Sequence, residues 1–300
     1  MLWSVRGFLS LRDRLPSDSW ETLVWFDRGK NSEILSLAHL SPVRLLIPEG
    51  CDMELHFFDT DKEYDIEKRY FTDANDIWGM LDRDRINIIC LQNFLVDPET
   101  FAPVIGRLFK SLIMRARNYS IHPENCAPGI LHPRITLFID ELNNIAPSKG
   151  NGLGSVEEAQ TGGWIQQNIE QLRAHKIRLW ASTHRWYGLR AGIRSSFPYN
   201  IALPGATYPK QEKRKLSKFV EVFEKLETGA CCFIFKKDIF SPPYKIPYTV
   251  PPGESLGYIT YKGDIKKEQP KKAERVQKNN VSAQDLINTL AAAIAGQAQQ

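Results

Sequence analysis

The sequence predicts an α/β fold built on a mostly parallel sheet. Short apolar segments that read as strands alternate with longer amphipathic segments that read as helices, as in parallel α/β proteins. One of the apolar segments, 135–139 (ITLFI), ends on two adjacent acids, Asp140 and Glu141. Because ligands of open α/β sheets bind at the carboxyl ends of the strands, we expect helices on both faces and a functional site at that edge.

The predicted elements can be given in chain order. The expected strands are 22–26, 45–47, 53–58, 86–91, 135–139, 177–182, 199–203 and 231–235. The expected helices are Leu2–Leu15, a segment near 73–81, 97–118, 164–175, 210–227 and a short amphipathic segment, 282–295. Helix 97–118 is predicted by Asp97 as its cap, Pro98 in its first turn and an apolar stripe with a 3.6-residue period. The charged stretch 59–85 reads mainly as surface turns, and the glycine-rich stretch 145–163 as a mobile loop.

Composition describes an ordinary globular protein, with 42% hydrophobic and 25% charged residues in a chain of 300. Five cysteines show no metal-ligand spacing, so we expect free thiols in a reducing compartment. No apolar run is long enough to span a bilayer and none reads as a secretion signal, which favours a cytoplasmic location.

Two regions are expected: a core over residues 1–255 and a basic flexible tail over 256–300. Residues 262–278 hold seven Lys or Arg and three acids, a balance of +4 that equals the net charge of the whole chain. Such a tail either keeps a protein in solution, which is the default interpretation, or binds DNA without sequence preference. The candidate DNA contacts are Lys266, Lys267, Lys271 and Lys272. The helix predicted at 282–295 could dock a protein partner or remain loose.

Several motifs stand in an order that resembles a known family. They are VWFDRGKNSEILSLAHLSPVRLLIPEG (24–50), INIICLQNFLVDPETFAPVIGRLFKSLI (86–113), FIDEL (138–142), IEQLRAHKIRLWASTH (169–184) and GIRSSFPYNIAL (192–203). In this order they resemble the HerA/FtsK superfamily of DNA-pumping P-loop ATPases, which includes the type IV secretion coupling proteins. The resemblance covers residues 5–250, and FIDEL is similar to the family's Walker B strand.

The resemblance implies a RecA-like ATPase core that uses ATP and Mg²⁺, moves DNA and assembles into a homo-oligomeric ring, expected to be a hexamer. It implies that Asp140 holds Mg²⁺ and that Glu141 orients and deprotonates the attacking water. His184 stands at the sensor position, where many relatives have Gln. Arg173 and Arg194 match positions from which an arginine can reach phosphate directly or across a subunit interface, although either could serve only to cap a helix or pair with an acid.

The loop 148–163 offers a further DNA contact, because loops near this position can line the pore of ring translocases. Lys149 is the candidate, whereas Glu157 and Glu158 in the same loop would repel DNA.

One departure from the family is large, since the phosphate-binding motif GxxxxGK[ST] is absent from the sequence. The only similar stretch is Gly29-Lys30-Asn31-Ser32, and Val24 stands where that motif needs its first glycine. The expected sheet therefore lacks the family's first strand and P-loop. We expect an N-terminally incomplete ATPase core that is inactive alone. The alternative is a degenerate scaffold subunit of such a ring that no longer hydrolyses ATP.

A third interpretation is an unrelated Mg²⁺-dependent nuclease that uses Asp140 and Glu141. Nuclease sites usually gather three or more acids, and Asp27 is the only other acid expected at a carboxyl strand end.

Overall fold

A computed structural model gives the fold of this protein. The residues that the structure describes are 1–27, 32–73, 75–90, 98–121, 134–146, 156–184, 188–205, 222–223, 225–235, 239–246 and 250–262.

The main sheet has six strands in the order β4-β2-β5-β1-β6-β7, and every neighbouring pair runs parallel. Its strands are β1 (Thr22–Asp27), β2 (Val43–Pro48), β4 (Ile66–Phe71), β5 (Ile86–Cys90), β6 (Ile135–Ile139) and β7 (Ile177–Ala181). The predicted α/β class with a mostly parallel sheet is confirmed.

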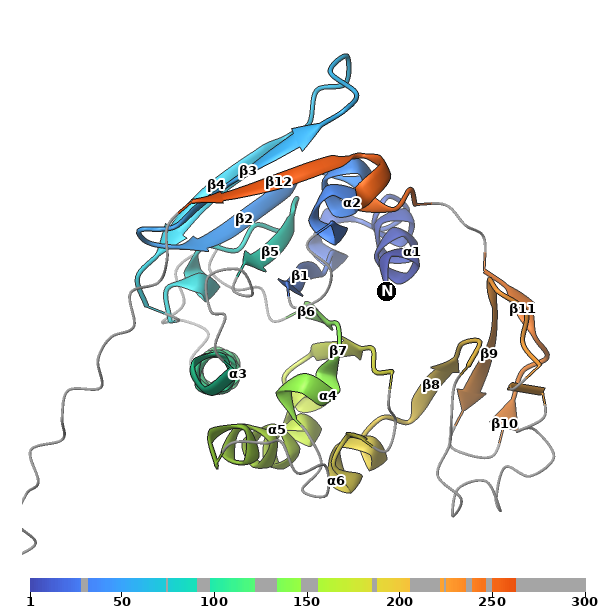
Figure 1. Cartoon of the computed structure of the whole chain (residues 1–300). Coiled ribbons are helices and arrows are strands. Elements are labelled where there is room, and N and C mark those ends of the chain that lie inside the picture. Colours follow the sequence, from blue (N-terminus) through green and yellow to red (C-terminus); the bar gives the residue numbers. More distant parts are fainter. Residues whose placement is uncertain are drawn as a thin grey trace, which may run out of the picture. The chain divides into compact units, whose positions relative to one another are not determined.

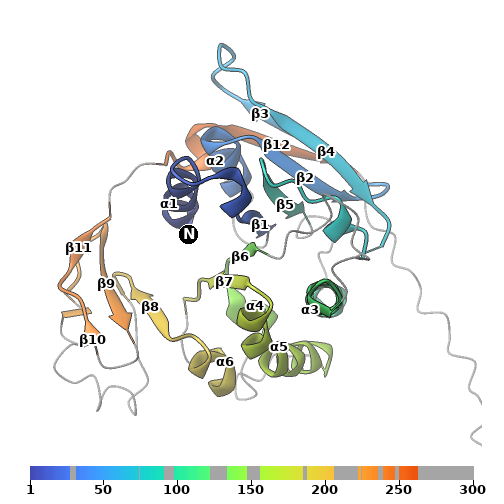
Figure 2. The ribbon, with the colours of Figure 1, turned by 180° about the vertical axis from the view of Figure 1, so that it is seen from behind.

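Helices cover both faces of this sheet. Successive residues of a strand point to opposite sides, so the side chains of β1 divide between two buried clusters. Val24 and Phe26 of β1 belong to one buried cluster, together with helices α3 (Pro98–Ile121) and α5 (Val156–Ala174). The alternate residues of β1 belong to a second cluster, with helices α1 (Leu2–Arg12) and α2 (Glu33–Leu40). The two pairs of helices are seen on opposite sides of the sheet in Figures 1 and 2. We call these the α3/α5 face and the α1/α2 face.

Two smaller sheets and several short helices complete the described part of the chain. An antiparallel sheet is formed by β8 (Tyr199–Ala202), β9 (Ala230–Phe235), β10 (Ile239–Phe240) and β11 (Tyr244–Lys245). A two-stranded antiparallel ribbon joins β3 (Asp52–Phe57) to β12 (Gly257–Lys262). The short helices are α4 (Leu142–Ile145), α6 (Ala191–Ser195), and the 3₁₀ turns η1 (Ser17–Ser19), η2 (Ile77–Gly79) and η6 (Gly253–Ser255).

The charged stretch 59–85 differs from the prediction, because it contains an edge strand of the main sheet. Strand β4, with the sequence IEKRYF, pairs with β2. The high charge of this stretch led to the prediction of surface turns. Edge strands are also charged, because charged side chains discourage pairing with the strands of other chains. The helix predicted near 73–81 is reduced to the single turn η2.

The glycine-rich stretch also differs, since helix α5 begins at Val156 and includes Gly162 and Gly163. A Cβ built on Gly162 would lie 2.9 Å from Nε of Arg190 and 3.3 Å from Cα of Ala146. This glycine therefore permits close packing inside a helix, and the prediction of a loop over residues 156–163 is wrong. Residues 147–155 lie outside the described part.

Strand β12 lies within the stretch that was assigned to the tail. Because β12 pairs with β3, the folded core includes residues beyond the expected boundary at residue 255. The compact unit extends from Met1 to Ile265. The predicted helix 282–295, and almost all of 210–227, lie outside the described residues.

Four cysteines are free and buried, as expected: Cys51, Cys90, Cys231 and Cys232. Within the described ranges, no helix is long and apolar enough to cross a membrane.

A buried asparagine secures the amino end of the sheet. The fully buried Asn87 of β5 donates through Nδ2 to the carbonyl oxygens of Leu23 (3.0 Å), Asp82 (2.7 Å) and Arg85 (3.2 Å). Its Oδ1 accepts a hydrogen bond from the backbone N–H of Asp82 at 2.8 Å. One side chain thus ties β5 to β1 and to the turn before β5.

We expect Asn87→Ala to lower the free energy of unfolding by about 3 kcal/mol, because the substitution leaves buried backbone groups without partners. Urea unfolding followed by tryptophan fluorescence measures the change. The exposed Asn75→Ala serves as the control, and it should shift stability by less than about 0.5 kcal/mol. Equal stabilities of the two variants would contradict this role of Asn87.

Candidate active site

The candidate site lies where β6 and β7 end side by side. The two strands are paired in register from Ile135 opposite Ile177 to Ile139 opposite Ala181. The ladder continues past the strands, since the backbone N–H of Ser182 donates to the carbonyl of Ile139 at 3.0 Å. The segment Asp140–Glu141 therefore lies next to the segment Ser182–His184, as the interpretation of the sequence requires.

Ser182 connects the two segments through its side chain. Its hydroxyl donates to Oδ1 of Asp140 and accepts a hydrogen bond from the backbone N–H of Glu141 at 3.2 Å. Its carbonyl accepts from the N–H of Leu142 at 3.0 Å. The hydroxyl thus fixes both acids relative to β7. Ser182 was not among the site residues predicted from the sequence.

Glu141 is held in an unusual backbone conformation. Its φ of 52° and ψ of 49° lie in the left-handed region, which costs a non-glycine residue about 1–2 kcal/mol. Such strain collects at functional sites, where the surrounding contacts maintain it. Here it places a mostly buried carboxylate, whose side chain is 17% exposed, with its Oε1 2.6 Å from Nε2 of His184.

His184 reaches Glu141 from the solvent side, since 87% of its own side chain is exposed. Burial raises the pKa of Glu141, the nearby His184 lowers it, and the neighbouring Asp140 raises it, with a net upward shift. A carboxylate with a raised pKa is a better proton acceptor than an ordinary one, and perturbed groups of this kind are concentrated in catalytic sites.

The residues present fit a magnesium ion of the kind found with nucleotides. Mg²⁺ prefers oxygen ligands and usually takes one or two carboxylates, with water and phosphate oxygens supplying the remainder. Asp140, with the hydroxyl of Ser182 beside it, provides such ligands. Within the described residues, no group of three or more His, Cys, Asp or Glu side chains could hold a metal ion alone.

The predicted arginines are less closely tied to these acids. The neighbouring Arg190 lies against α5, with its guanidinium group close to Gly162 and Gly163. Arg194 is in the last turn of α6 and is half-buried. Arg173 is in α5, but its side chain lies outside the described part of the structure. The catalytic roles of Arg173 and Arg194 stay predictions.

The predicted DNA contacts all fall outside the described residues. They are Lys149, Lys266, Lys267, Lys271 and Lys272.

A third acid at the same edge is fully buried. Asp27 ends β1, which lies between β5 and β6, and Cys90 of β5 is its partner across the sheet. Asp27 is only 1% exposed, and neither carboxyl oxygen has a hydrogen-bond partner. Burial, with a smaller contribution from Glu33, raises the pKa of Asp27 to about 8. The sequence placed this acid at a strand end, but its complete burial depends on packing that no local pattern reveals.

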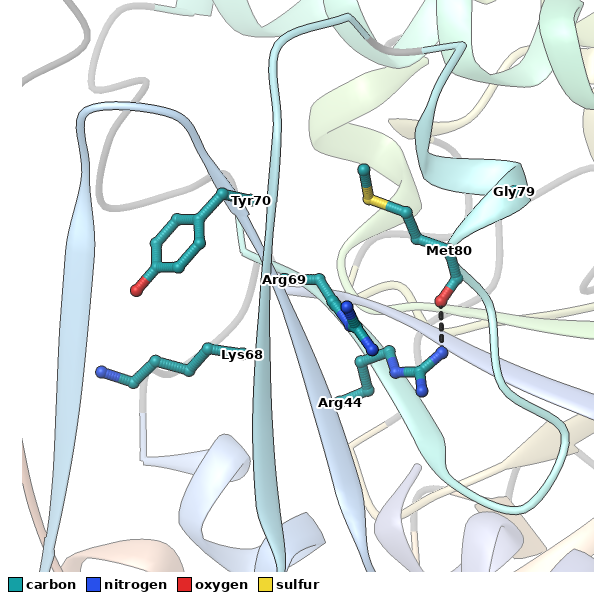
Figure 3. A pocket seen from close by; sticks show the side chains of 6 residues that line it. All are labelled: Arg44, Lys68, Arg69, Tyr70, Gly79 and Met80. Carbon is teal, nitrogen blue, oxygen red and sulfur yellow. Dashed lines mark hydrogen bonds between the residues drawn. The ribbon is translucent and has the colours of Figure 1, made fainter.

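A cavity of about 540 Å³ lies elsewhere, beside β4. Figure 3 shows Lys68 and Tyr70 on one side of this strand, with Arg69 and Arg44 on the other. The cations are already paired with acids, which argues against a phosphate site. The ion pairs are Arg44 with Glu67 and Asp82, Lys68 with Asp52, and Arg69 with Glu67.

Comparison with known proteins gives matches among solved structures alone: no protein-family model and no curated protein sequence matches this chain. The genome packaging NTPase B204 from Sulfolobus turreted icosahedral virus 2, in complex with ATP-gammaS, matches with 13% identity and a TM-score of 0.37. The match covers 77% of this chain and 99% of that one.

Two further solved structures match at similar levels. The cytoplasmic domain of the Type VII secretion ATPase EccC from Thermomonospora curvata has 13% identity and a TM-score of 0.39, covering 75% of this chain and 25% of that one. The pCW3 conjugation coupling protein TcpA, with ATPgS, has 14% identity and a TM-score of 0.32, covering 76% and 61%. At such identities and scores they transfer no residue roles.

Proposed function

We propose that this chain is the nucleotide-hydrolysing core of an ATP-driven DNA translocase of the HerA/FtsK type. The observation that carries the proposal is the pairing of Glu141 with His184, at 2.6 Å, beside the hydrogen bond between Asp140 and Ser182. Two acids and two polar partners thus converge at the carboxyl ends of neighbouring parallel strands, the edge at which ligands bind in such sheets.

Each residue has a distinct role in this proposal. Glu141 takes a proton from the attacking water, since its carboxylate is mostly buried and its pKa is raised. His184 orients Glu141 and is exposed enough to contact a phosphate. Asp140 would hold Mg²⁺, with Ser182 fixing its carboxylate. When bound, Mg²⁺ neutralises charge on the phosphate oxygens.

The proposed partners and location follow from the resemblance of the sequence motifs to the HerA/FtsK superfamily. The chain acts in a homo-oligomeric ring, expected to be a hexamer, in the cytoplasm. DNA is the cargo, and the basic tail contributes contacts to its phosphates. Lys149 is a further DNA contact, and Arg173 and Arg194 stabilise charge at the phosphates.

The scaffold alternative is favoured by one feature of the sequence. The chain has no GxxxxGK[ST] motif, which supplies the backbone amides and the lysine that hold the phosphates of ATP in P-loop proteins. In this alternative the protein retains the sheet and its interfaces, and does not turn ATP over.

ATP hydrolysis distinguishes the two functions. We expect residues 1–300 alone to show negligible hydrolysis, and the same chain with a GxxxxGK[ST] segment joined ahead of Met1 to hydrolyse ATP with stimulation by DNA. Phosphate release measured with and without double-stranded DNA is the test. An extended chain that has the motif but lacks activity would reject the enzyme and leave the scaffold.

DNA binding tests the tail separately. Affinity should fall steeply with salt, and replacement of Lys266, Lys267, Lys271 and Lys272 by Gln should reduce the slope of log K against log salt by about 3 to 4. A slope that this replacement does not change would remove these four lysines from DNA binding.

A further inference from the structure

The two faces of the small antiparallel sheet differ in burial. On one face, Cys232 and Ile234 of the central strand β9 belong to a buried cluster that includes Ala202 of β8. Phe233 and Phe235 alternate with these residues along β9, so their side chains point to the other face. The solvent face of an antiparallel sheet usually carries polar side chains. The second face of this sheet is therefore unusual, because its central residues are aromatic.

Four aromatic rings form a continuous path across this second face. Phe235 contacts Tyr199 of β8 and Phe233, with ring centroids 5.9 and 6.3 Å apart. Phe233 in turn contacts Tyr244 of β11, with centroids 5.9 Å apart. Ile239 of β10 is the partner of Phe235 across the sheet, and cross-strand partners share a face. We call these five residues the aromatic face; Figure 1 shows the strands that carry it.

The aromatic face is open to solvent. The exposed fractions are 63% for Tyr199, 61% for Ile239, 51% for Tyr244 and 39% for Phe235. With about 200 Å² for a large side chain, these four expose on the order of 400 Å² of largely apolar surface. An exposed apolar patch of that size usually marks a binding surface.

The charge around this face indicates what kind of partner binds. Residues 199–246 hold nine Lys or Arg and five acids, a balance of +4, and the aromatic face itself has no charged residue. Two of these cations, Lys225 and Lys245, are exposed in the structure. Two copies of this segment facing one another would repel, because like charges are opposed across an interface. A polyanion is attracted instead, and a nucleic acid is a polyanion that also carries flat aromatic groups.

Aromatic rings favour a single strand over a duplex. In a duplex the faces of the bases are already stacked on each other, and the outer surface offers phosphates and base edges. A single strand exposes the faces of its bases, which can stack on aromatic side chains while cations attract its phosphates. A flat sheet surface with several rings in contact is suited to such stacking.

We propose that the aromatic face binds single-stranded DNA, with bases stacked on Tyr199, Phe235 and Tyr244 and with phosphates attracted by the basic segment. Because every base has an aromatic face, the binding has little sequence preference. That the strand is DNA rather than RNA rests on the proposed function. The binding of a single strand rests on this face alone and needs neither ATP nor the acids at the end of β6.

Oligonucleotide binding to the 300-residue protein tests the proposal. Fluorescence anisotropy of a labelled strand of about 20 nucleotides gives the affinity, and the same sequence as a duplex and as RNA gives the comparisons. We expect the single DNA strand to bind more tightly than the duplex, and Tyr199→Ala, Phe235→Ala and Tyr244→Ala each to weaken its binding about tenfold. Tyr244→Phe should keep the affinity, because it retains the ring.

Phe58→Ala is the matched control. Phe58 is 63% exposed, as Tyr199 is, but it follows β3 and lies outside the aromatic face. This variant should bind the single strand as the unmodified protein does. Circular dichroism checks that each variant is folded, which is expected because the replaced side chains are exposed.

The salt dependence separates this face from the basic tail. Replacing an aromatic ring removes stacking and releases no additional counterions, so the slope of log K against log salt should stay unchanged while the affinity falls. Replacement of the four tail lysines changes the slope instead. The aromatic variants are therefore also compared in a chain that carries the four Lys→Gln changes, where the same tenfold loss is expected.

Three results would overturn the proposal. They are an affinity that the alanine substitutions on the aromatic face leave unchanged, a duplex that binds as tightly as the single strand, and self-association that Phe235→Ala abolishes in a protein that binds no oligonucleotide. The last result would make the face a contact between copies of the chain. Tighter binding of the RNA strand would overturn DNA as the ligand.

This proposal and the proposed function can fail separately. Ring-dependent binding of a single strand by a chain that never hydrolyses ATP would retain the aromatic face and reject the enzyme. Hydrolysis stimulated equally by DNA in the unmodified protein and in Phe235→Ala, with no ring-dependent binding, would retain the enzyme and reject the aromatic face.

Discussion

Glu141→Gln is expected to lower the rate of ATP hydrolysis about a thousandfold in the P-loop-bearing extended chain, with little change in nucleotide affinity. The amide keeps the size of the side chain and can still contact His184, but it cannot accept a proton from water. The loss should therefore appear in kcat. Steady-state phosphate release and calorimetric titration with a non-hydrolysable ATP analogue measure the two quantities.

The pH dependence of hydrolysis gives a second readout of the same residue. Burial raises the pKa of Glu141, and a base acts only in its ionised form. Activity should therefore rise with pH through this raised pKa and be lost on the acid side. Glu170→Gln, at an exposed position of α5, is the matched control and should change neither kcat nor the profile. Turnover that survives Glu141→Gln would remove Glu141 from the mechanism.

Asp27 is expected to make the stability of the protein depend strongly on pH. Its pKa is about 8 in the folded protein and 3.8 as the ordinary reference, so folding takes up a proton between these values. The stabilisation is complete below the lower pKa and is lost as pH rises toward the higher one. The free energy of unfolding should therefore fall by about 1.4 kcal/mol per pH unit over this window through Asp27 alone.

Asp27→Asn should remove this contribution, because the amide does not titrate. Urea unfolding at pH 5.5, 6.5 and 7.5 gives the slope for each protein, and the difference in slope is the readout. Absolute stability is a poorer measure, since a buried amide introduces donors that also need partners. Asp61→Asn, at an exposed position, should keep the slope of the unmodified protein. Parallel curves for the unmodified protein and Asp27→Asn would show that Asp27 is ionised when folded.

Local patterns were sufficient for much of the sheet. The apolar runs around Val24, Ile88 and Leu137 are strands because β-branched and large apolar residues fill a sheet that is covered on both faces. The acid pair after β6 was also evident, because a change from buried apolar residues to carboxylates marks a strand end. Strand β4 was missed because an edge strand need not be apolar, so its sequence resembles that of a surface turn.

The glycines of α5 show a different limit. In a sequence, Gly162 and Gly163 indicate freedom of the backbone, and a loop is the natural interpretation. In the structure, Gly162 lies in a helix that packs closely against Ala146 and Arg190. The need for a small residue came from a neighbour that is close in space and distant in the chain.

The sequence by itself determined that a parallel α/β sheet forms and that Asp140 and Glu141 stand at its carboxyl edge. Both follow from periodicity and residue type within a few positions of the chain. Tertiary structure alone decided that the Ser182 hydroxyl holds those acids and that Asp27 is completely buried. These features depend on strand order and register, which join residues some 40 or more positions apart, a separation over which local periodicity carries no information.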